Sequence, residues 1–171
     1  MKALVVYESM FGNTQSIAES IAKGLAESMD VEILEVGSAP TALNNLDLLV
    51  VGGPTHQFGM SRPQSREAAF AETDKALISE SIGIREWIAA VRIDQAGLAC
   101  ATFDTKVEKP HLPGAASKKA EKKLRKKGTR IVLEAETFDV GGMTGPLVDG
   151  ETERAHFWGE TLASAASVAS V

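Results

Sequence analysis

The sequence predicts an α/β fold: a doubly wound, five-stranded parallel sheet in the order 2-1-3-4-5, with helices on both faces as α/β/α layers. Short apolar runs typical of buried strands alternate with longer segments whose apolar residues recur at helical spacing. The first, third and fourth runs lead directly into loops that contain hydroxyl, amide, glycine or charged groups. Those three strands are neighbours in a sheet of this order, so we expect their loops to meet in one crevice at the carboxyl edge.

Five segments are expected to form the strands. Residues 2–8 contain an unbroken apolar run, and residues 48–52 are apolar throughout, which indicates burial on both faces of the sheet. The remaining strands are expected at residues 31–36, 97–103 and 130–136, with loops following at 104–106 and 140–150. The glycine-rich part of the last loop, residues 141–146, either covers a substrate or only connects two elements, and we favour a connection because the fifth strand lies one place away from the crevice.

Helices are expected after residue 14 and between the later strands. The other expected helices are residues 62–78, 84–91, 115–127 and 151–169. In the helix at 115–127, the inward stripe would be Ala116, Ala120 and Leu124, and Gly128 would end the helix. In the last helix, the inward residues would be Phe157, Trp158, Leu162 and Ala165.

Length and composition are typical of one globular domain spanning residues 1–171, with 44% apolar and 24% charged residues. No apolar run approaches the roughly 20 residues of a membrane span. The N-terminus enters a strand without the basic region of a signal peptide. Cys100 is the single cysteine, so we expect a buried thiol in a cytoplasmic protein. Three histidines and one cysteine argue against a dedicated zinc site, and no metal site is predicted.

The charge distribution is uneven. The chain has a net charge of −5, yet residues 117–127 carry seven basic residues against Glu121, a net of +6. The rest of the chain has 11 basic and 22 acidic residues, which argues against general nucleic-acid binding. The basic helix is therefore either a solvated face or a docking surface for an acidic redox partner, whose encounter rate would fall with salt.

The turn between the first strand and the first helix is Ser9-Met10-Phe11-Gly12-Asn13-Thr14. A helix N-terminus offers unpaired N–H groups and a partial positive charge, which together bind an anion. Gly12 allows close approach of the backbone, and the hydroxyl and amide side chains can donate hydrogen bonds. The same residue types also cap ordinary helices. The turn is thus either a plain cap or a phosphate site without a cationic side chain.

Two motifs at this spacing resemble those of the flavodoxin family: the turn at 9–14, and Gly52-Gly53-Pro54-Thr55-His56 after the third strand. The resemblance covers nearly the whole chain in the order and length of its elements. It implies a flavodoxin-like fold that binds FMN noncovalently and transfers electrons. The FMN phosphate would be held by Ser9, Met10, Phe11, Gly12, Asn13 and Thr14. The isoalloxazine ring would be held by Pro54, Thr55, His56, Gln57, Phe58, Gly59, Thr102, Phe103, Asp104 and Thr105.

Some positions depart from the pattern of short electron-carrying flavodoxins. Phe11 stands where those proteins usually have a hydroxyl residue, and an aromatic there is more similar to flavodiiron proteins and quinone reductases. Residues 54–60 also look like the corresponding loop of the tryptophan-repressor-binding-protein type of NAD(P)H:quinone oxidoreductase. The loop after the fourth strand lacks the tyrosine that often stacks on the flavin. These departures bear on redox potential and electron number more than on FMN itself.

Several side chains near the expected flavin admit two interpretations. His56 and Phe58 either flank the ring, or are a surface histidine and a packed phenylalanine. An unperturbed His56 would titrate near neutral pH and could donate a hydrogen bond to reduced flavin. Asp104 and Lys106 either face the flavin or are solvated loop charges.

Three functions are compatible with the sequence, and no side chain is predicted to be catalytic. The favoured one is an FMN-binding electron carrier that exchanges electrons with a reductase and an acceptor, because no nicotinamide site is recognisable. The second is an FMN-dependent NAD(P)H:quinone-type oxidoreductase. The third is a binding module that keeps the flavodoxin fold without flavin.

Overall fold

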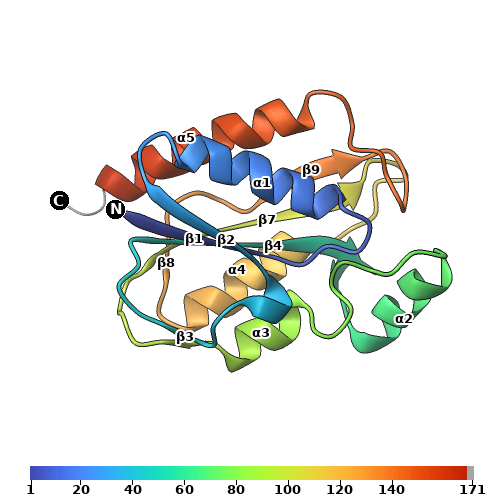
Figure 1. The fold of residues 1–171 in the computed structure, drawn as a ribbon, viewed down its shortest axis with the longest axis horizontal. Helices are drawn as coiled ribbons and strands as arrows, with labels where there is room; N and C mark the ends of the chain where they lie inside the picture. Colours follow the sequence, from blue (N-terminus) through green and yellow to red (C-terminus); the bar gives the residue numbers. More distant parts are fainter. Residues whose placement is uncertain (169–171) are drawn as a thin grey trace.

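The computed structural model describes residues 1–168 and has three layers, with a mostly parallel sheet between two pairs of helices (Figure 1). The sheet runs in the order β2-β1-β4-β7-β8, which confirms the predicted order. Its strands are β1 (Lys2–Tyr7), β2 (Asp30–Glu35), β4 (Leu48–His56), β7 (Ala99–Val107) and β8 (Arg130–Ile131), while β9 (Glu136–Val140) also pairs with β7. The first halves of β4 and β7 and most of β1 are apolar and buried because helices cover both of their faces.

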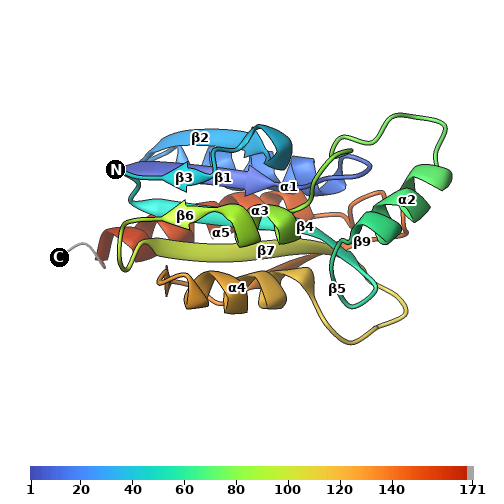
Figure 2. The ribbon, with the colours of Figure 1, turned by 90° about the horizontal axis from the view of Figure 1, so that it is seen from below.

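Helices α1 (Asn13–Leu25) and α5 (Glu151–Val168) cover one face of the sheet (Figure 1). Helices α3 (Ile84–Ala90) and α4 (Ala116–Lys126) cover the other (Figure 2). Helix α2 (Pro63–Ala71) lies beyond the carboxyl ends of the strands. The remaining short elements are η1 (Val36–Ser38), β3 (Ala42–Leu43), β5 (Gly59–Met60) and β6 (Arg92–Ile93).

Each face of the sheet has its own apolar core. Under α1 and α5, the rings of Phe103, Phe138 and Trp158 contact one another edge to face. The two helices pack so closely that a Cβ on Gly24 would lie 2.1 Å from the backbone oxygen of His156. On the other face, the predicted stripe of α4 is confirmed: its three residues are fully buried. This packing fixes the strand ends from which the loops emerge.

The fifth strand differs from the prediction. Residues 130–136 do not form one strand; β8 has two residues, and β9 begins only at Glu136. Between them the Ala135 N–H donates to Glu121 Oε2 on α4, at 2.9 Å, instead of to the sheet. The chain then returns to the edge of β7, where Phe103 is level with Glu136 and Val107 with Val140. The carboxyl end of β9 therefore reaches the same edge as that of β7.

Other boundaries also need correction. The helix expected at 62–78 ends at Ala71, and the last helix turns Phe157 outward, with 67% of its surface exposed. Residues 53–56 and 104–106 belong to β4 and β7, because these strands pair as far as Pro54 and Thr105. The expected position 169 of the last helix lies outside the described residues. Cys100 is buried as expected, and burial raises the pKa of its thiol to about 12.

In the described residues, none of the helices combines the length and apolar character that crossing a membrane requires.

Candidate functional site

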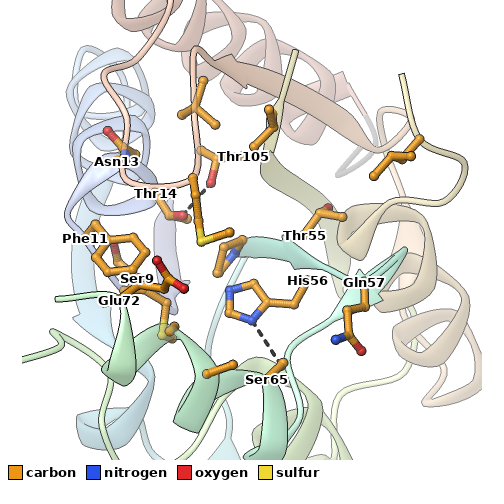
Figure 3. A pocket seen from close by; sticks show the side chains of 18 residues that line it. Ser9, Phe11, Asn13, Thr14, Thr55, His56, Gln57, Ser65, Glu72 and Thr105 are labelled. Carbon is orange, nitrogen blue, oxygen red and sulfur yellow. Dashed lines mark hydrogen bonds between the residues drawn. The ribbon is translucent and has the colours of Figure 1, made fainter. Parts of the chain in front are cut away.

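A cavity of about 330 Å³ opens at the carboxyl ends of β1, β4 and β7, between helix α2 and the loop after β9 (Figure 3). The predicted convergence of three chain segments is therefore confirmed. Ten of the residues predicted to bind the cofactor line this cavity: Ser9, Met10, Phe11, Asn13, Thr14, Pro54, Thr55, His56, Gln57 and Thr105. Within the described part of the chain, no lysine or arginine side chain lines it.

The turn at 9–14 is held in shape by its own hydroxyl groups. Ser9 Oγ accepts hydrogen bonds from the N–H groups of Gly12, at 3.2 Å, and Gln15, at 3.3 Å. Gly12 has a φ of +99°, a conformation that strongly favours glycine, and it directly precedes α1. The hydroxyls of Thr14 and Thr105 lie 2.7 Å apart and join the turn to β7. A helix N-terminus and two hydroxyl residues therefore meet at one end of the cavity (Figure 3).

His56 stands in the wall of the cavity with its ring turned toward α2 (Figure 3). Its Nδ1 lies 3.1 Å from Ser65 Oγ, whose own proton is donated to the carbonyl of Arg62. In this arrangement the neutral ring carries its proton on Nδ1 and offers Nε2 as an acceptor. Burial, and next the charge of Arg66, lower the pKa of His56 to about 4. The expected titration near neutral pH is therefore wrong for this buried ring, and a role of His56 toward reduced flavin stays a prediction.

Thr55 joins the cavity wall to the start of α4. Its hydroxyl donates to Asp104 Oδ2, at 2.8 Å, and accepts from the N–H of Ala116, at 2.9 Å. The same carboxylate oxygen accepts from the N–H of Ser117, at 3.1 Å. Asp104 is fully buried behind the wall and caps α4. It is therefore neither a solvated charge nor a group that lines the cavity.

The structure does not bring all the predicted residues into the cavity lining. Thr102 donates to the carbonyl of Ser117, at 2.9 Å, and Phe103 lies in the core. Phe58 is 46% exposed, so it is not packed under its loop. Like these, Gly12, Gly59 and Asp104 do not line the cavity. Lys106, expected either to face the flavin or to be a solvated loop charge, does not line the cavity and donates to the carbonyls of residues 112 and 114.

Sequence reasoning missed three segments of the wall, one of which is the loop after β7 with Leu112. Helix α2 contributes its inner side, with Glu72 at its end (Figure 3). The end of β9 contributes Val140 and the following loop contributes Met143, and a Cβ on Gly145 would lie 2.7 Å from Asn13 Oδ1. The interpretation of residues 141–146 as a mere connection is therefore wrong. The loop reaches the cavity because the fifth strand is split and β9 pairs with β7, which no local pattern of the sequence indicates.

A buried network beside the cavity holds α2 in place. Glu8, the residue before the turn at 9–14, is fully buried and accepts hydrogen bonds from Ser61 Oγ and from the N–H of Ile84, the latter at 2.8 Å. Arg66 on α2 donates to Ser61 Oγ, at 2.8 Å, and forms an ion pair with Glu86 on α3. The end of β1 is thereby joined to both helices.

Three comparisons bear on the family. The model of the flavodoxin family matches residues 5–158. Among solved structures, oxidised flavodoxin 1 from Bacillus cereus is similar with a TM-score of 0.70 and 21% identity, over 96% of this chain and 98% of that one. The flavodoxin, WrbA-like protein from Agrobacterium tumefaciens gives a TM-score of 0.61 and 18% identity, over 98% of both chains.

The flavodiiron core of Flv1 from Synechocystis sp. PCC6803 gives a TM-score of 0.66 and 18% identity, over 99% of this chain but 36% of that one. At sequence identities of 18% to 21%, the similarity to these solved structures shows the fold alone. The search of curated protein sequences found no match. Because the family model spans most of the sequence, and the fold and the cavity agree with it, the chain belongs to the flavodoxin family, whose cofactor is FMN.

Proposed function

We propose that this protein binds FMN in the cavity at the ends of β1, β4 and β7 and passes electrons between partner proteins. When bound, FMN supplies the redox chemistry, while the protein supplies its position and its electrostatic surroundings. The observation that carries the proposal is the turn at 9–14, which presents hydroxyl groups and the N-terminus of α1 to the cavity. The family of the chain points to the same cofactor.

The residues at the α1 end of the cavity fit a phosphate group. Ser9, Asn13 and Thr14 line it, and each can donate a hydrogen bond. Because Gly12 carries no side chain, the backbone of the turn can approach an anion closely. No cation lines the described cavity, so the N–H groups and the dipole of α1 would balance the phosphate charge.

The rest of the cavity fits a flat aromatic ring system. Its walls include apolar side chains from four segments: Met10, Val107, Leu112, Val140 and Met143. Such a lining excludes water, and the volume of about 330 Å³ is in the range of small-molecule sites. The neutral His56 would offer Nε2 as an acceptor in this wall. No nucleophile or general base is needed for electron transfer, and the proposal assigns none.

The partner for electron exchange is proposed to be acidic near its docking site. Five exposed lysines on α4, here called the basic face, support this: Lys118, Lys119, Lys122, Lys123 and Lys126. The helix begins behind the cavity wall, where the N–H of Ala116 contacts Thr55. Lys119 also packs on Gly59 of the β4–β5 hairpin, where a Cβ would lie 2.8 Å from its Cδ. Charges this close to the site can steer a partner toward it.

The second candidate function, reduction of quinones by NAD(P)H, has one observation in its favour: Phe11, the aromatic residue shared with quinone reductases, lines the cavity (Figure 3). Oxidation of NADPH by the purified holoprotein, with a quinone as acceptor, would establish this enzyme. An electron carrier should show no such turnover unless a separate reductase is added.

The experiment that tests FMN binding is a titration of the apoprotein followed by quenching of flavin fluorescence. We expect saturable binding that is lost in Gly12→Val, because a side chain is strained at this φ, and in Asn13→Asp, because a carboxylate repels phosphate. Gly97→Val and Asn45→Asp are matched controls, since both residues are exposed, have positive φ and lie outside the cavity lining. Absence of binding by the unaltered protein would refute the proposal and support a module that works without flavin.

A further inference from the structure

Residues 77–79, here called the strap, lie against the turn at 9–14 although they follow it by about 70 positions. The N–H of Ser79 donates to the carbonyl of Ser9, at 2.8 Å, and the N–H of Ile78 donates to the carbonyl of Met10, at 3.2 Å. In return, the N–H of Ser9 donates to Ser79 Oγ, at 3.0 Å. Leu77 anchors the strap by packing against Met10 and the α2 side chain Ala69.

These bonds set the direction of the peptide groups in the turn. In a planar trans peptide, the C=O and the N–H point to opposite sides. The strap donates hydrogen bonds to the carbonyls of Ser9 and Met10. These carbonyls share peptide planes with the N–H groups of Met10 and Phe11, respectively. The N–H groups of Met10 and Phe11 are therefore directed away from the strap. An anion is held by N–H groups and repelled by carbonyl oxygens, so this orientation favours phosphate.

The hydroxyl of Ser79 fixes the strap to the sheet as well. Ser79 is buried, and its Oγ donates its single proton to Glu35 Oε1, at 2.6 Å. The other oxygen of this carboxylate accepts from the N–H of Gly37, at 2.7 Å, so Glu35 is itself held in place. With its proton committed to Glu35, Ser79 Oγ can offer only its lone pairs to the turn, and the N–H of Ser9 takes one of them.

We propose that Ser79 is a positioning residue for the FMN phosphate: it links the end of β2 to Ser9 and keeps the turn at 9–14 in its anion-binding form. This inference rests on the proposed function, because the turn is assigned there to the phosphate. It adds a residue outside the turn and outside the cavity lining, one position beyond the helix that was expected at 62–78.

The test compares FMN with riboflavin, which has the same ring system and no phosphate. Both are titrated into the apoproteins of the unaltered chain, Ser79→Ala and Ser81→Ala. The last is a matched control, because Ser81 is exposed in the same segment. In Ser79→Ala the buried N–H of Ser9 loses its acceptor, so we expect the FMN dissociation constant to rise about tenfold while that of riboflavin stays unchanged.

Glu35→Ala is a second variant that leaves Ser79 itself intact. It removes the acceptor of the Ser79 proton, and we expect a smaller rise in the FMN dissociation constant, again without a change for riboflavin. Hydrogen exchange of residues 9–14 in the apoproteins, compared by mass spectrometry, should become faster in Ser79→Ala and stay unchanged in Ser81→Ala. Faster exchange here shows that the turn itself has loosened.

Each outcome decides. An equal loss of affinity for both flavins would mean a general structural role and would overturn the proposal, as would unchanged affinity for FMN. If the unaltered protein binds riboflavin and FMN equally, the turn does not hold the phosphate and the proposal fails while flavin binding stands. If it binds neither, the proposed function fails first, and this result is distinct from all the others.

Discussion

The replacement Glu8→Gln should change how the stability of the protein depends on pH. Glu8 is fully buried at the end of β1, with Ser61 Oγ and the N–H of Ile84 as its hydrogen-bond donors. Burial raises the pKa of its carboxyl to about 7, and these donors and Arg66 only partly oppose the effect. Glutamine resembles the protonated acid in shape and charge, so the variant removes the titration with little change in packing.

The sign follows from the two states of the chain. Between its unfolded pKa of 4.5 and its folded pKa of about 7, Glu8 keeps its proton in the folded state only. The stabilisation is complete below the unfolded pKa and is lost as the pH rises through the folded one. Between about pH 5 and about pH 8, the loss for a fully buried group is about 2.5 kcal/mol.

His56 changes the stability in the opposite direction. Its pKa falls from 6.5 to about 4 on folding, so the unfolded chain takes up a proton first as the pH drops. This destabilises the fold by up to about 2 kcal/mol between about pH 8 and about pH 5. The two effects nearly cancel in the unaltered protein. Glu8→Gln exposes the contribution of His56, and the variant should become less stable toward acid.

Urea unfolding at a series of pH values measures this directly. The difference in unfolding free energy between Glu8→Gln and the unaltered protein should shift by about 2.5 kcal/mol across that range, with the variant gaining relative stability at the alkaline end. His56→Gln is the counterpart, and its stability should fall as the pH rises. Parallel pH profiles for Glu8→Gln and the unaltered protein would refute the assignment of a proton to Glu8.

Two further predictions concern the wall of the cavity and the basic face. Thr55→Val should lower the free energy of unfolding by about 1 to 3 kcal/mol, because the N–H of Ala116 loses its acceptor and Asp104 keeps only the N–H of Ser117 as a donor. Thr55→Ser should retain most of the stability in the same urea titration. Oxidation of the reduced holoprotein by ferricyanide should slow as ionic strength rises, since the basic face near the site outweighs the net charge of −5 at short range. Replacing Lys119 and Lys122 by glutamate should flatten or invert the salt dependence of the oxidation rate, measured by stopped flow. A rate that rises with salt in the unaltered protein would contradict the steering role.

Much of the fold follows from patterns that are local in the sequence. The buried runs at β1, β4 and β7 and the helical spacing in α1 and α4 are each set by a single face that must be covered. The order of the strands and the meeting of three segments at one edge follow from rules of parallel sheets. The errors fall where a contact from a distant residue decides the conformation, as Glu121 does when it takes the N–H of Ala135 from the fifth strand.

The candidate site divides in the same way. Residues near the strand ends, such as Thr14 in the first turn of α1 and Thr105 on β7, were predicted because the sheet brings its strand ends and the following turns together. Asp104 was misjudged because a charged residue next to an apolar run looks like the start of a loop, whereas its carboxylate is paired with Thr55 and the start of α4. The contribution of α2 escaped prediction, since nothing in its composition indicates which neighbour its inner side contacts.

Glu8, the residue after β1, and Ser9, the first residue of the turn, both contact residues far along the chain that no motif at the site includes. Glu8 reaches Ile84, 76 positions away, and Ser9 reaches Ser79, 70 positions away. These adjacent residues tie α3 and the strap to the same strand end. A change in either contact would move a piece of the cavity wall and the turn at 9–14 together. Because Glu8 and Ser9 are joined by a single peptide bond, we expect flavin binding to be coupled to the packing of residues 61–86.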